Sequence, residues 1–372
     1  MPTIVDLLEY KRKILGDLGN NLENESRRRA SEDYHSKRRP RPCGMTIHTG
    51  IGCGFSCMYC YIYDMGFSAM AKQYPLEPKE LVYALTLNPY VIPERTLAAY
   101  GSVTEPFQPE TAERAIKYMR EVWRHLKLPS QVSTKAILTN EITSGMLSSD
   151  PNINVLVTVV TLSNRRLEPK APDPLMRIDS AGRSAEAGLN VSLFIRPIIP
   201  SVTDAEANRI LSLAAYKGME SVTLGSLRVT KRILYNLERC GVTRGEIERR
   251  LLKPLKGNKQ IEIRSQDLKN KIRRVAEDLR LKVFKAACEA NMYYHKRYCA
   301  ICHMGPCNTN IKAERLEDSD IRDLLEYLGA PYSFVEVDDE SIKIGLKGAQ
   351  ADGYIRYLMT MGTYRRTVFL KE

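Results

Sequence analysis

The chain has 372 residues, 43% of them hydrophobic and 27% charged, which is typical of one large globular domain with extensions or of two ordinary domains. No apolar run approaches the roughly 20 residues that cross a bilayer, and the first residues lack the apolar core of a secretory signal. The sequence therefore argues against a membrane protein and predicts a cytoplasmic location.

The formal net charge is +12, and much of the excess lies in residues 26–41 and 228–282. Such a concentration favours an anionic partner, of which nucleic acid is the commonest, and a solvated basic helix face explains it equally well. The nine cysteines include two groups of three, which fits metal ligation in a reducing compartment better than a disulfide framework.

The first predicted element is a helix over residues 4–18, and a polar, basic connector that packs loosely is expected up to residue 42. From residue 43 onward apolar strand patterns alternate with helical ones such as 109–127. The predicted strands cover 45–49, 97–100, 132–139, 155–161, 191–198 and 221–224. Six β-α units predict a partial (β/α)6 TIM-type barrel over residues 43–285, with reactive residues at the C-terminal ends of its strands.

The remainder of the chain is predicted to add two smaller parts. After the sixth strand we expect a helical LLKPLK segment at 251–256 broken by Pro254 and Gly257, a helix at 269–279 and a further strand at 281–286. A cysteine-rich metal segment follows at 286–311. Residues 312–372 are expected to form a small α+β unit, with helices at 318–328 and 350–361 and strands at 332–337, 341–346 and 364–370.

Three cysteines, Cys53, Cys57 and Cys60, lie within eight residues directly after the first predicted strand. A structural zinc site needs four ligands, so three thiolates do not complete one. Three thiolates do leave one iron of a [4Fe–4S] cluster without a protein ligand, and an open metal position can bind oxygen and nitrogen atoms of another molecule. The loop position directs such a cluster into the barrel cavity.

The spacing of these cysteines, with the aromatic Tyr59 before the third, resembles the cluster loop of the radical S-adenosylmethionine superfamily. The stretches YGSVTEPFQPE (100–110), LEPKAPDPLMRIDSAGRSAEAGL (167–189) and RPIIPSVTD (196–204) are similar to its spore photoproduct lyase-like branch, over about residues 40–285. The resemblance implies a catalytic [4Fe–4S] cluster, S-adenosylmethionine and an electron donor such as ferredoxin or flavodoxin. It implies reductive cleavage of the cofactor and hydrogen abstraction from a substrate.

The resemblance also implies cofactor contacts. Thr104 and Glu105 would contact the methionine amine, and Thr158 would approach the methionine or the ribose. Two positions depart from the family pattern. Asn140 stands where the branch often has a lysine, so the contact to the cofactor carboxylate is lost or replaced there, and Ser102 stands where the lyases have a hydrogen-donating cysteine. The serine O–H bond is too strong for that task, which argues against thymine-dimer reversal by that route.

Four further residues match positions of the family. Tyr59 and Tyr61 fall where the lyases carry two tyrosines near the radical path, so both are candidate catalytic residues. Glu168 and Arg177 also match, although a simple ion pair at the barrel rim explains them as well.

A second group, Cys299, Cys302 and Cys307 in RYCAICHMGPC, lies outside the predicted barrel, with Cys288 as the expected fourth ligand and His303 as a second option. Four thiolates suit either an auxiliary [4Fe–4S] cluster or a structural zinc. We favour the iron–sulfur cluster because radical enzymes of this kind often carry auxiliary clusters, and zinc is the alternative.

The remaining candidates have ordinary explanations beside functional ones. Cys43 and Cys240 are expected to be simple thiols, and His48 to be structural rather than cavity-lining. The aromatic run 293–298 fits base stacking or core packing, and the basic stretches 27–29 and 37–41 fit a phosphate-binding arm or a solvated linker.

We expect nucleic acid with a modified or damaged base as the substrate, contacted by Arg249, Arg250, Arg273 and Arg274. Radical C–H modification of a protein, peptide or small metabolite is the alternative activity. A non-catalytic nucleic-acid-binding metalloprotein with two structural clusters is the alternative of another class. The oligomeric state is left open.

Overall fold

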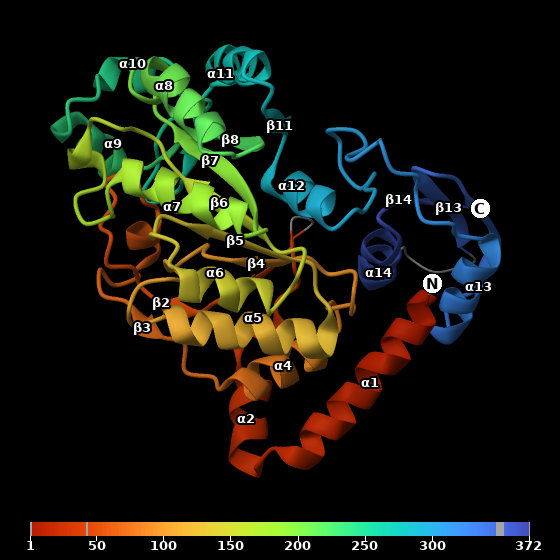
Figure 1. Ribbon diagram of the computed structural model, residues 1–372. Coiled ribbons are helices and arrows are strands. Elements are labelled where there is room, and N and C mark those ends of the chain that lie inside the picture. The colour runs from red at the N-terminus through yellow and green to blue at the C-terminus, as the bar shows by residue number, and fades with distance from the viewer. Residues whose placement is uncertain (1, 42–43, 347–352, 372) are drawn as a thin grey trace.

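The computed structural model describes residues 2–41, 44–346 and 353–371. Figure 1 shows a larger body on the left and a smaller C-terminal unit on the right, with a long N-terminal helix running between them. Within the described ranges no helix combines the length and the apolar character that a bilayer crossing requires.

A seven-stranded parallel sheet forms the larger body, in the order β1-β4-β5-β6-β7-β8-β11. Its strands are β1 Met45–Ile47, β4 Ala98–Tyr100, β5 Ser130–Thr134, β6 Asn154–Thr158, β7 Asn190–Ile198, β8 Ser221–Ser226 and β11 Lys282–Phe284. In the part of the chain that the structure describes, β1 and β11 do not pair, so the barrel is open between them. The predicted partial barrel is confirmed, and the further strand expected at 281–286 is its seventh strand.

Helices cover the outer face of this sheet because each carries an apolar stripe. They are α4 Pro78–Leu87, α5 Ala112–Leu126, α6 Asn140–Leu147, α7 Pro174–Glu186, α8 Thr203–Tyr216 and α11 Gln266–Asp278. In α5, for example, the buried residues Ala115, Tyr118, Met119 and Val122 recur at intervals of three and four. They pack against the outward side chains of the sheet in one continuous core.

The N-terminal end of the barrel interior is closed by α12 (Ala287–Tyr294). Gln131 donates from Nε2 to the carbonyl of Ala287 at 2.7 Å, and the hydroxyls of Ser221 and Tyr294 lie 2.9 Å apart. Tyr294 also packs against Phe284. This part of the aromatic run 293–298 therefore serves core packing.

The predicted helix at 251–256 is wrong. Leu251 instead forms an isolated bridge to Ile263, and the segment between them contains bends and turns. Pro254 explains the difference, because it lacks an amide donor and disfavours helical geometry in the residue before it. The helices of this region are α9 Lys231–Arg239 and α10 Arg244–Glu248, and the strands β9 Arg228–Val229 and β10 Ile261–Glu262 pair antiparallel.

The expectation of a loosely packed connector is also wrong. After α1 (Ile4–Asn21) the chain forms α2 (Asn24–Glu32) and α3 (Tyr34–Lys37), and both contact α4. Arg29 of α2 pairs with the buried carboxylate of Glu80. Asn88 holds the end of α3 by donating to the carbonyls of His35 and Arg38 at 2.8 and 2.7 Å.

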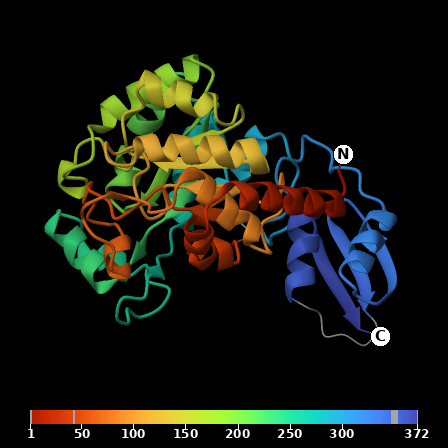
Figure 2. The ribbon, with the colours of Figure 1, turned by 90° about the horizontal axis from the view of Figure 1, so that it is seen from below.

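Helix α1 belongs to two cores, and Figure 2 shows it reaching from the barrel to the C-terminal unit. Ile14 and Leu18 lie in the barrel core, whereas Ile4 and Leu7 lie in the core of the C-terminal unit. Between these pairs, the buried Lys11 donates from Nζ to the carbonyls of residues 88 and 91. Burial lowers the pKa of Lys11 to about 7.

The C-terminal unit is a small α+β structure, as expected. It contains α13 Asp318–Tyr327, β12 Tyr332–Val337, β13 Ser341–Leu346, α14 Gly353–Thr363 and β14 Arg366–Lys371. β13 pairs antiparallel with β12 and parallel with β14. Residues 350–352 of the predicted last helix lie outside the described residues.

Candidate active site

The first three cysteines lie on the long loop between β1 and α4, which contains the short strands β2 (Gly50–Ile51) and β3 (Lys72–Gln73) and the 3-10 helix η1 (Ile62–Met65). Cys53, Cys57 and Cys60 all line one cavity, which has a volume of about 90 Å³ and is open to solvent. The cavity lies at the C-terminal ends of β4, β5 and β6. Its other lining residues are Phe55, Tyr59, Ile62, Gly101, Ser102, Val103, Thr104, Glu105, Ser133, Thr134, Lys135 and Thr158.

The structure therefore brings Thr104, Glu105 and Thr158 together with the three cysteines, although up to 105 positions separate them in sequence. The hydroxyl of Thr104 donates to the carbonyl of Gly52 at 2.8 Å, which joins the cysteine loop to the end of β4. Among the described residues the hydroxyl of Thr158 has no hydrogen bond, so it is available to a molecule in the cavity.

The carboxylate of Glu105 is buried and held by three donors. It accepts from the Thr134 hydroxyl at 2.5 Å, from the Lys135 amide at 2.8 Å and from the Phe107 amide at 3.2 Å. Burial raises the pKa of Glu105, and these donors oppose that rise. A carboxylate fixed in this way is suited to receive an ammonium group.

Gln108, which the sequence analysis missed, fixes the start of the cysteine loop. Its Oε1 accepts from the Gly54 amide at 2.8 Å, and its Nε2 lies 3.8 Å from the sulfur of Cys53. A Cβ at Gly54 would lie 2.6 Å from that same Oε1, so a larger residue there would displace the Gln108 amide.

Helix α9 holds the other end of the loop. Arg232 donates to the carbonyl of Cys60 at 2.6 Å and to both carboxylate oxygens of Asp64, at 2.7 and 2.9 Å. Thr230 donates to the same carboxylate at 2.9 Å. No local sequence signal indicated this contact, because its partners lie more than 160 positions apart.

Two buried charged residues, Glu168 and Arg177, anchor the cysteine loop to the barrel. Tyr59 donates to one carboxylate oxygen of Glu168, and Arg177 donates to the other. Arg177 also donates to the carbonyl of Thr158 at 2.7 Å. The side chains of Glu168 and Arg177 are both 0% exposed, so this is an ion pair in the core rather than at the barrel rim.

The thiols of the loop lie in an environment that favours their neutral form. Burial raises the pKa values of Cys53, Cys57 and Cys60. Lys135, directly after β5, is a cation that lowers the pKa values of both Cys57 and Cys60. Burial opposes the charge of Lys135, but Cys57, Glu168 and Cys60 together raise its pKa.

Asn140 does not join the other candidate residues. It is the first residue of α6, it is exposed, and it is not among the residues that line the cavity. A lysine does occupy the cavity wall after the third barrel strand, but it is Lys135, five positions earlier.

The two candidate tyrosines differ in their surroundings. Tyr59 lines the cavity, and its hydroxyl is bound to Glu168, so burial and then that carboxylate raise the pKa of Tyr59 well above its ordinary value. Tyr61 donates to the carbonyl of Ser102 at 2.6 Å, and Ser102 lines the cavity.

The second group of cysteines lies between the barrel and the C-terminal unit. The backbones of Cys299 and Cys307 form an antiparallel bridge, with N···O distances of 3.3 and 2.8 Å. Cys288 and Cys299 pack against the apolar cluster of Leu97, Met292 and Tyr364. Burial raises the pKa of Cys299 to about 11 and that of Cys307 to about 12.

Within the described ranges, no three His, Cys, Asp or Glu side chains converge closely enough to hold a single metal ion. A zinc ion needs all its sulfur ligands at about 2.3 Å, so neither cysteine group forms such a site in this conformation. The ligands of a multi-iron cluster bind separate irons and do not have to converge on one point.

Two other candidate residues, Cys240 and His48, have contacts that indicate a structural role. Cys240 is buried and its thiol donates to the carbonyl of Arg166 at 3.3 Å, whereas Cys43 lies outside the described residues. His48 stacks on Tyr34 with ring centroids 5.8 Å apart and does not line the cavity. Burial lowers the pKa of His48 to about 4.

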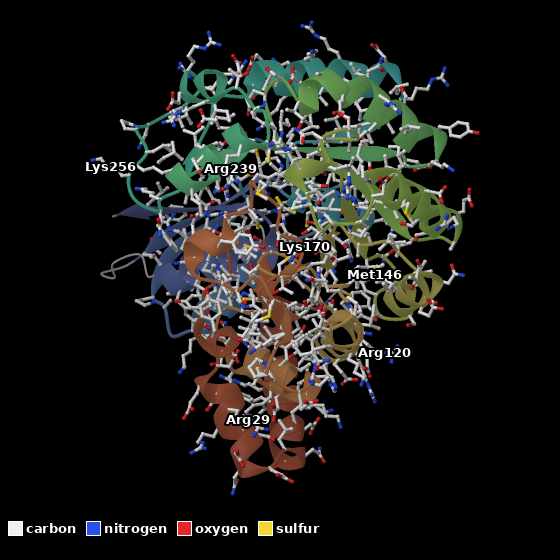
Figure 3. The ribbon with its side chains drawn as sticks, turned by 90° about the vertical axis from the view of Figure 1, so that its left-hand side faces the viewer. Arg29, Arg120, Met146, Lys170, Arg239 and Lys256 are labelled. Carbon is white, nitrogen blue, oxygen red and sulfur yellow. The ribbon has the colours of Figure 1, made fainter. Side chains whose placement is uncertain are left out.

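The arginines expected to contact nucleic acid fall into two pairs. Arg249 is bound to Glu246, and Arg250 to both Glu246 and Asp267. Arg273 and Arg274 on α11 form no ion pair within the described part of the chain. Figure 3, which views the side that is on the left in Figure 1, labels further basic residues, Lys170, Arg239 and Lys256.

The partial parallel barrel, with three cysteines on the loop after its first strand, is similar in fold to solved structures of spore photoproduct lyase, the branch to which the sequence resemblance pointed. A variant with bound AdoMet and dinucleoside spore photoproduct is 16% identical, with a TM-score of 0.57 over 72% of this chain and 86% of that one. Another variant is 17% identical, with a TM-score of 0.55 over 66% of this chain and 78% of that one.

Sequence comparison adds an uncharacterized protein, ORF301, of Acidianus two-tailed virus. It is 22% identical over 175 residues, which cover 42% of this chain. The matched region spans 56% of the length of that relative. No protein-family model matches the chain.

Proposed function

We propose that this protein is a radical S-adenosylmethionine enzyme whose [4Fe–4S] cluster is held by Cys53, Cys57 and Cys60. The observation that carries the proposal is that these three thiols line one cavity with Thr104, Glu105 and Thr158. When bound, the cluster supplies the electron for reductive cleavage of S-adenosylmethionine and thereby for hydrogen abstraction from a substrate.

The donor set fits such a cluster. The described residues that line the cavity include three cysteines and neither a fourth cysteine nor a histidine, so the protein can ligate three irons and leave the fourth to the cofactor. Gln108 donates toward the sulfur of Cys53, and hydrogen bonds to cluster sulfurs are one way in which a protein sets the reduction potential.

The side chains around the cysteines have separate tasks in this proposal. Glu105 accepts the ammonium group of the methionine moiety, and Lys135 offers a cation to its carboxylate. Thr158 offers a free hydroxyl at the end of the neighbouring strand β6. Phe55 and Val103 supply apolar surface that limits access of water to the reacting atoms.

Nucleic acid with a modified or damaged base is the substrate class that we propose. The fold likeness to a lyase solved with a dinucleoside photoproduct and the excess of basic residues support it. Ser102, on the cavity wall, cannot act as a hydrogen-atom donor, so the reaction would end differently from lyase chemistry. C–H modification of a protein, peptide or small metabolite remains the second candidate, because the cavity itself is not specific for a base.

We further propose that Cys288, Cys299, Cys302 and Cys307 hold an auxiliary [4Fe–4S] cluster, with zinc as the alternative, and that the electron donor is a ferredoxin or flavodoxin. The four cysteines lie in one segment between two bodies of the molecule. The cytoplasmic location and the domain limits at 42, 285 and 311 belong to the same proposal.

Anaerobic reconstitution and reduction with S-adenosylmethionine test the proposal. We expect about eight irons per chain if both groups hold [4Fe–4S] clusters and about four irons with zinc if only the first does. We also expect release of 5′-deoxyadenosine. A fully loaded sample that releases none would contradict the enzymatic proposal and favour a binding protein.

A further inference from the structure

Arg196 lies beside the cavity on the face of the sheet that lines it. Phe194 of β7 is the register partner of Thr158, which lines the cavity. Because alternate residues of a strand share a face, Arg196 lies on the same face as Phe194, one step closer to the C-terminal edge. The side chain is exposed, and its guanidinium lies 5.8 Å from the centre of the Phe194 ring.

Arg196 has no acidic partner within the described ranges, unlike Arg177 or Arg232 near the same cavity. Its position is fixed by Gly225 on the neighbouring strand. A Cβ at Gly225 would lie 2.6 Å from both Cγ and Cδ of Arg196. The arginine therefore lies across β8, where a larger residue would displace it.

Helix α11 brings two more cations to this place. The hydroxyls of Ser265, just before α11, and Ser226, next to Gly225, are 2.9 Å apart, so the helix starts beside Arg196. Lys269 and Arg273 follow at intervals of four residues and share one helix face. Burial lowers the pKa of Lys269, and the charges of Arg196 and Arg273 lower it further.

The acid that acts on Lys269 is already engaged. Glu262 raises the pKa of Lys269, but its carboxylate is paired with Arg228 at 3.3 Å. Phe194, whose ring the Arg196 guanidinium approaches, is the register partner of the cavity residue Thr158. The cations therefore border the cavity.

We propose that Arg196, Lys269 and Arg273 form an anion-binding track that holds phosphodiester groups of a nucleic acid while one nucleotide enters the cavity. The inference rests on the proposed function and specifies where its substrate binds. A single carboxylate needs one cation, whereas a row of cations without free acids matches a polyanion. Within this row, Arg196 lies on β7, the strand that pairs with the strand of the cavity residue Thr158.

The test measures binding of a labelled single-stranded oligonucleotide to the cluster-loaded enzyme between about 50 and 200 mM salt. We expect Arg196→Gln to weaken binding and to reduce the slope of log K against log salt by about 1. Gly225→Ala should weaken binding similarly although it removes no charge, because the new Cβ displaces the arginine.

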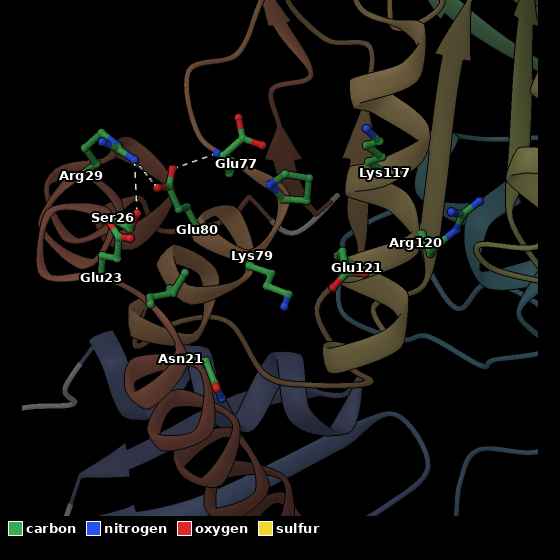
Figure 4. A pocket seen from close by; sticks show the side chains of 12 residues that line it. Asn21, Glu23, Ser26, Arg29, Glu77, Lys79, Glu80, Lys117, Arg120 and Glu121 are labelled. Atoms are coloured by element: carbon green, nitrogen blue, oxygen red, sulfur yellow. Dashed lines mark hydrogen bonds and ion pairs between the residues drawn. The ribbon is translucent and has the colours of Figure 1, made fainter.

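Arg120→Gln is the matched control, because it removes the same charge far from the cavity. Arg120 lies on α5 at the edge of a groove whose lining contains four cations, Arg29, Lys79, Lys117 and Arg120, and four acids, Glu23, Glu77, Glu80 and Glu121 (Figure 4). We expect this variant to bind the oligonucleotide like the wild type.

Three results would overturn the inference. Equal losses in Arg196→Gln and Arg120→Gln would show that only net charge matters. A higher KM for S-adenosylmethionine with unchanged oligonucleotide binding would assign Arg196 to the cofactor carboxylate. A wild-type enzyme that binds no oligonucleotide but releases 5′-deoxyadenosine would overturn the substrate class and leave the radical chemistry intact.

Discussion

The two cysteine groups have similar spacings in sequence but different surroundings in the structure. Cys53, Cys57 and Cys60 line a cavity with buried polar side chains, and a core ion pair supports their loop. Cys299 and Cys307 lie in a segment of turns joined by one backbone bridge, next to an apolar cluster. Cysteine spacing therefore identifies the type of ligand, whereas the groups around the sulfurs distinguish a catalytic site from a structural one.

The largest expected difference between the two groups is in catalysis. Mutating a residue that only hydrogen-bonds to a metal ligand typically lowers activity by about 10–100-fold. Cys57→Ala removes a ligand itself, so it should lower 5′-deoxyadenosine release by more than about 100-fold. Cys302→Ala should lose the metal of the second site and keep most of the release. Both variants are assayed after identical anaerobic loading, with iron counted per chain. Loss of release in both would mean that the second group also takes part in catalysis.

Removing the core ion pair that supports the loop of the first cysteine group should cause a large loss of stability. Glu168→Gln leaves Arg177 as a buried charge without its carboxylate, and such a change costs about 3–5 kcal/mol. The free energy of unfolding is measured by guanidinium titration. Glu113→Gln, which breaks an exposed pair with Lys117 on α5, is the control and should leave the transition unchanged. Equal stability of the two variants would argue against a supporting role for Glu168.

The segment that carries the second cysteine group should loosen when a single hydrogen bond beside it is removed. The hydroxyl of Tyr364 donates to the carbonyl of Arg95, and its own carbonyl accepts from the Ala300 amide at 2.8 Å. Tyr364→Phe removes the first bond and should cost about 1–2 kcal/mol. We expect faster tryptic cleavage at Lys296 or Arg297, with unchanged release of 5′-deoxyadenosine. Unchanged cleavage would mean that this bond does not hold the segment.

A further effect depends on pH and concerns the helix that joins the two regions. Because burial lowers the pKa of Lys11 to about 7, the unfolded chain binds one more proton than the folded chain above that pH. Stability should therefore rise from pH 7 toward pH 10, by at most about 1.4 kcal/mol per pH unit. Lys11→Met should flatten this rise, and urea titrations at each pH compare the two proteins. Parallel curves would contradict the assignment.

The barrel could be predicted because its strands are short apolar runs and its helices carry regular apolar stripes, as the buried face of α5 illustrates. The cysteines, Thr104, Glu105 and Thr158 could be named because a family motif carries them. The ends of elements were harder to place. The third strand ends at Thr134, so the cavity lysine is Lys135, while the sequence pattern continued to residue 139 and directed attention to Asn140.

Other features depend on contacts that no local pattern reveals. The polar helix α2 has only one fully buried residue, Ala30, and is held by the pair of Arg29 with Glu80. Arg232 reaches Asp64 across more than 160 positions. In each case a partner distant in sequence, rather than intrinsic propensity, determines the local structure.

Helix α1 gives the molecule a mechanical property. One rigid rod carries Ile4 and Leu7 into the C-terminal unit and Ile14 and Leu18 into the barrel. Neither the barrel nor the C-terminal unit can rotate against the other without bending α1 or pulling one end of it out of its core. The cysteine-rich segment also connects these two bodies, so α1 limits how far the distances between its cysteines can vary.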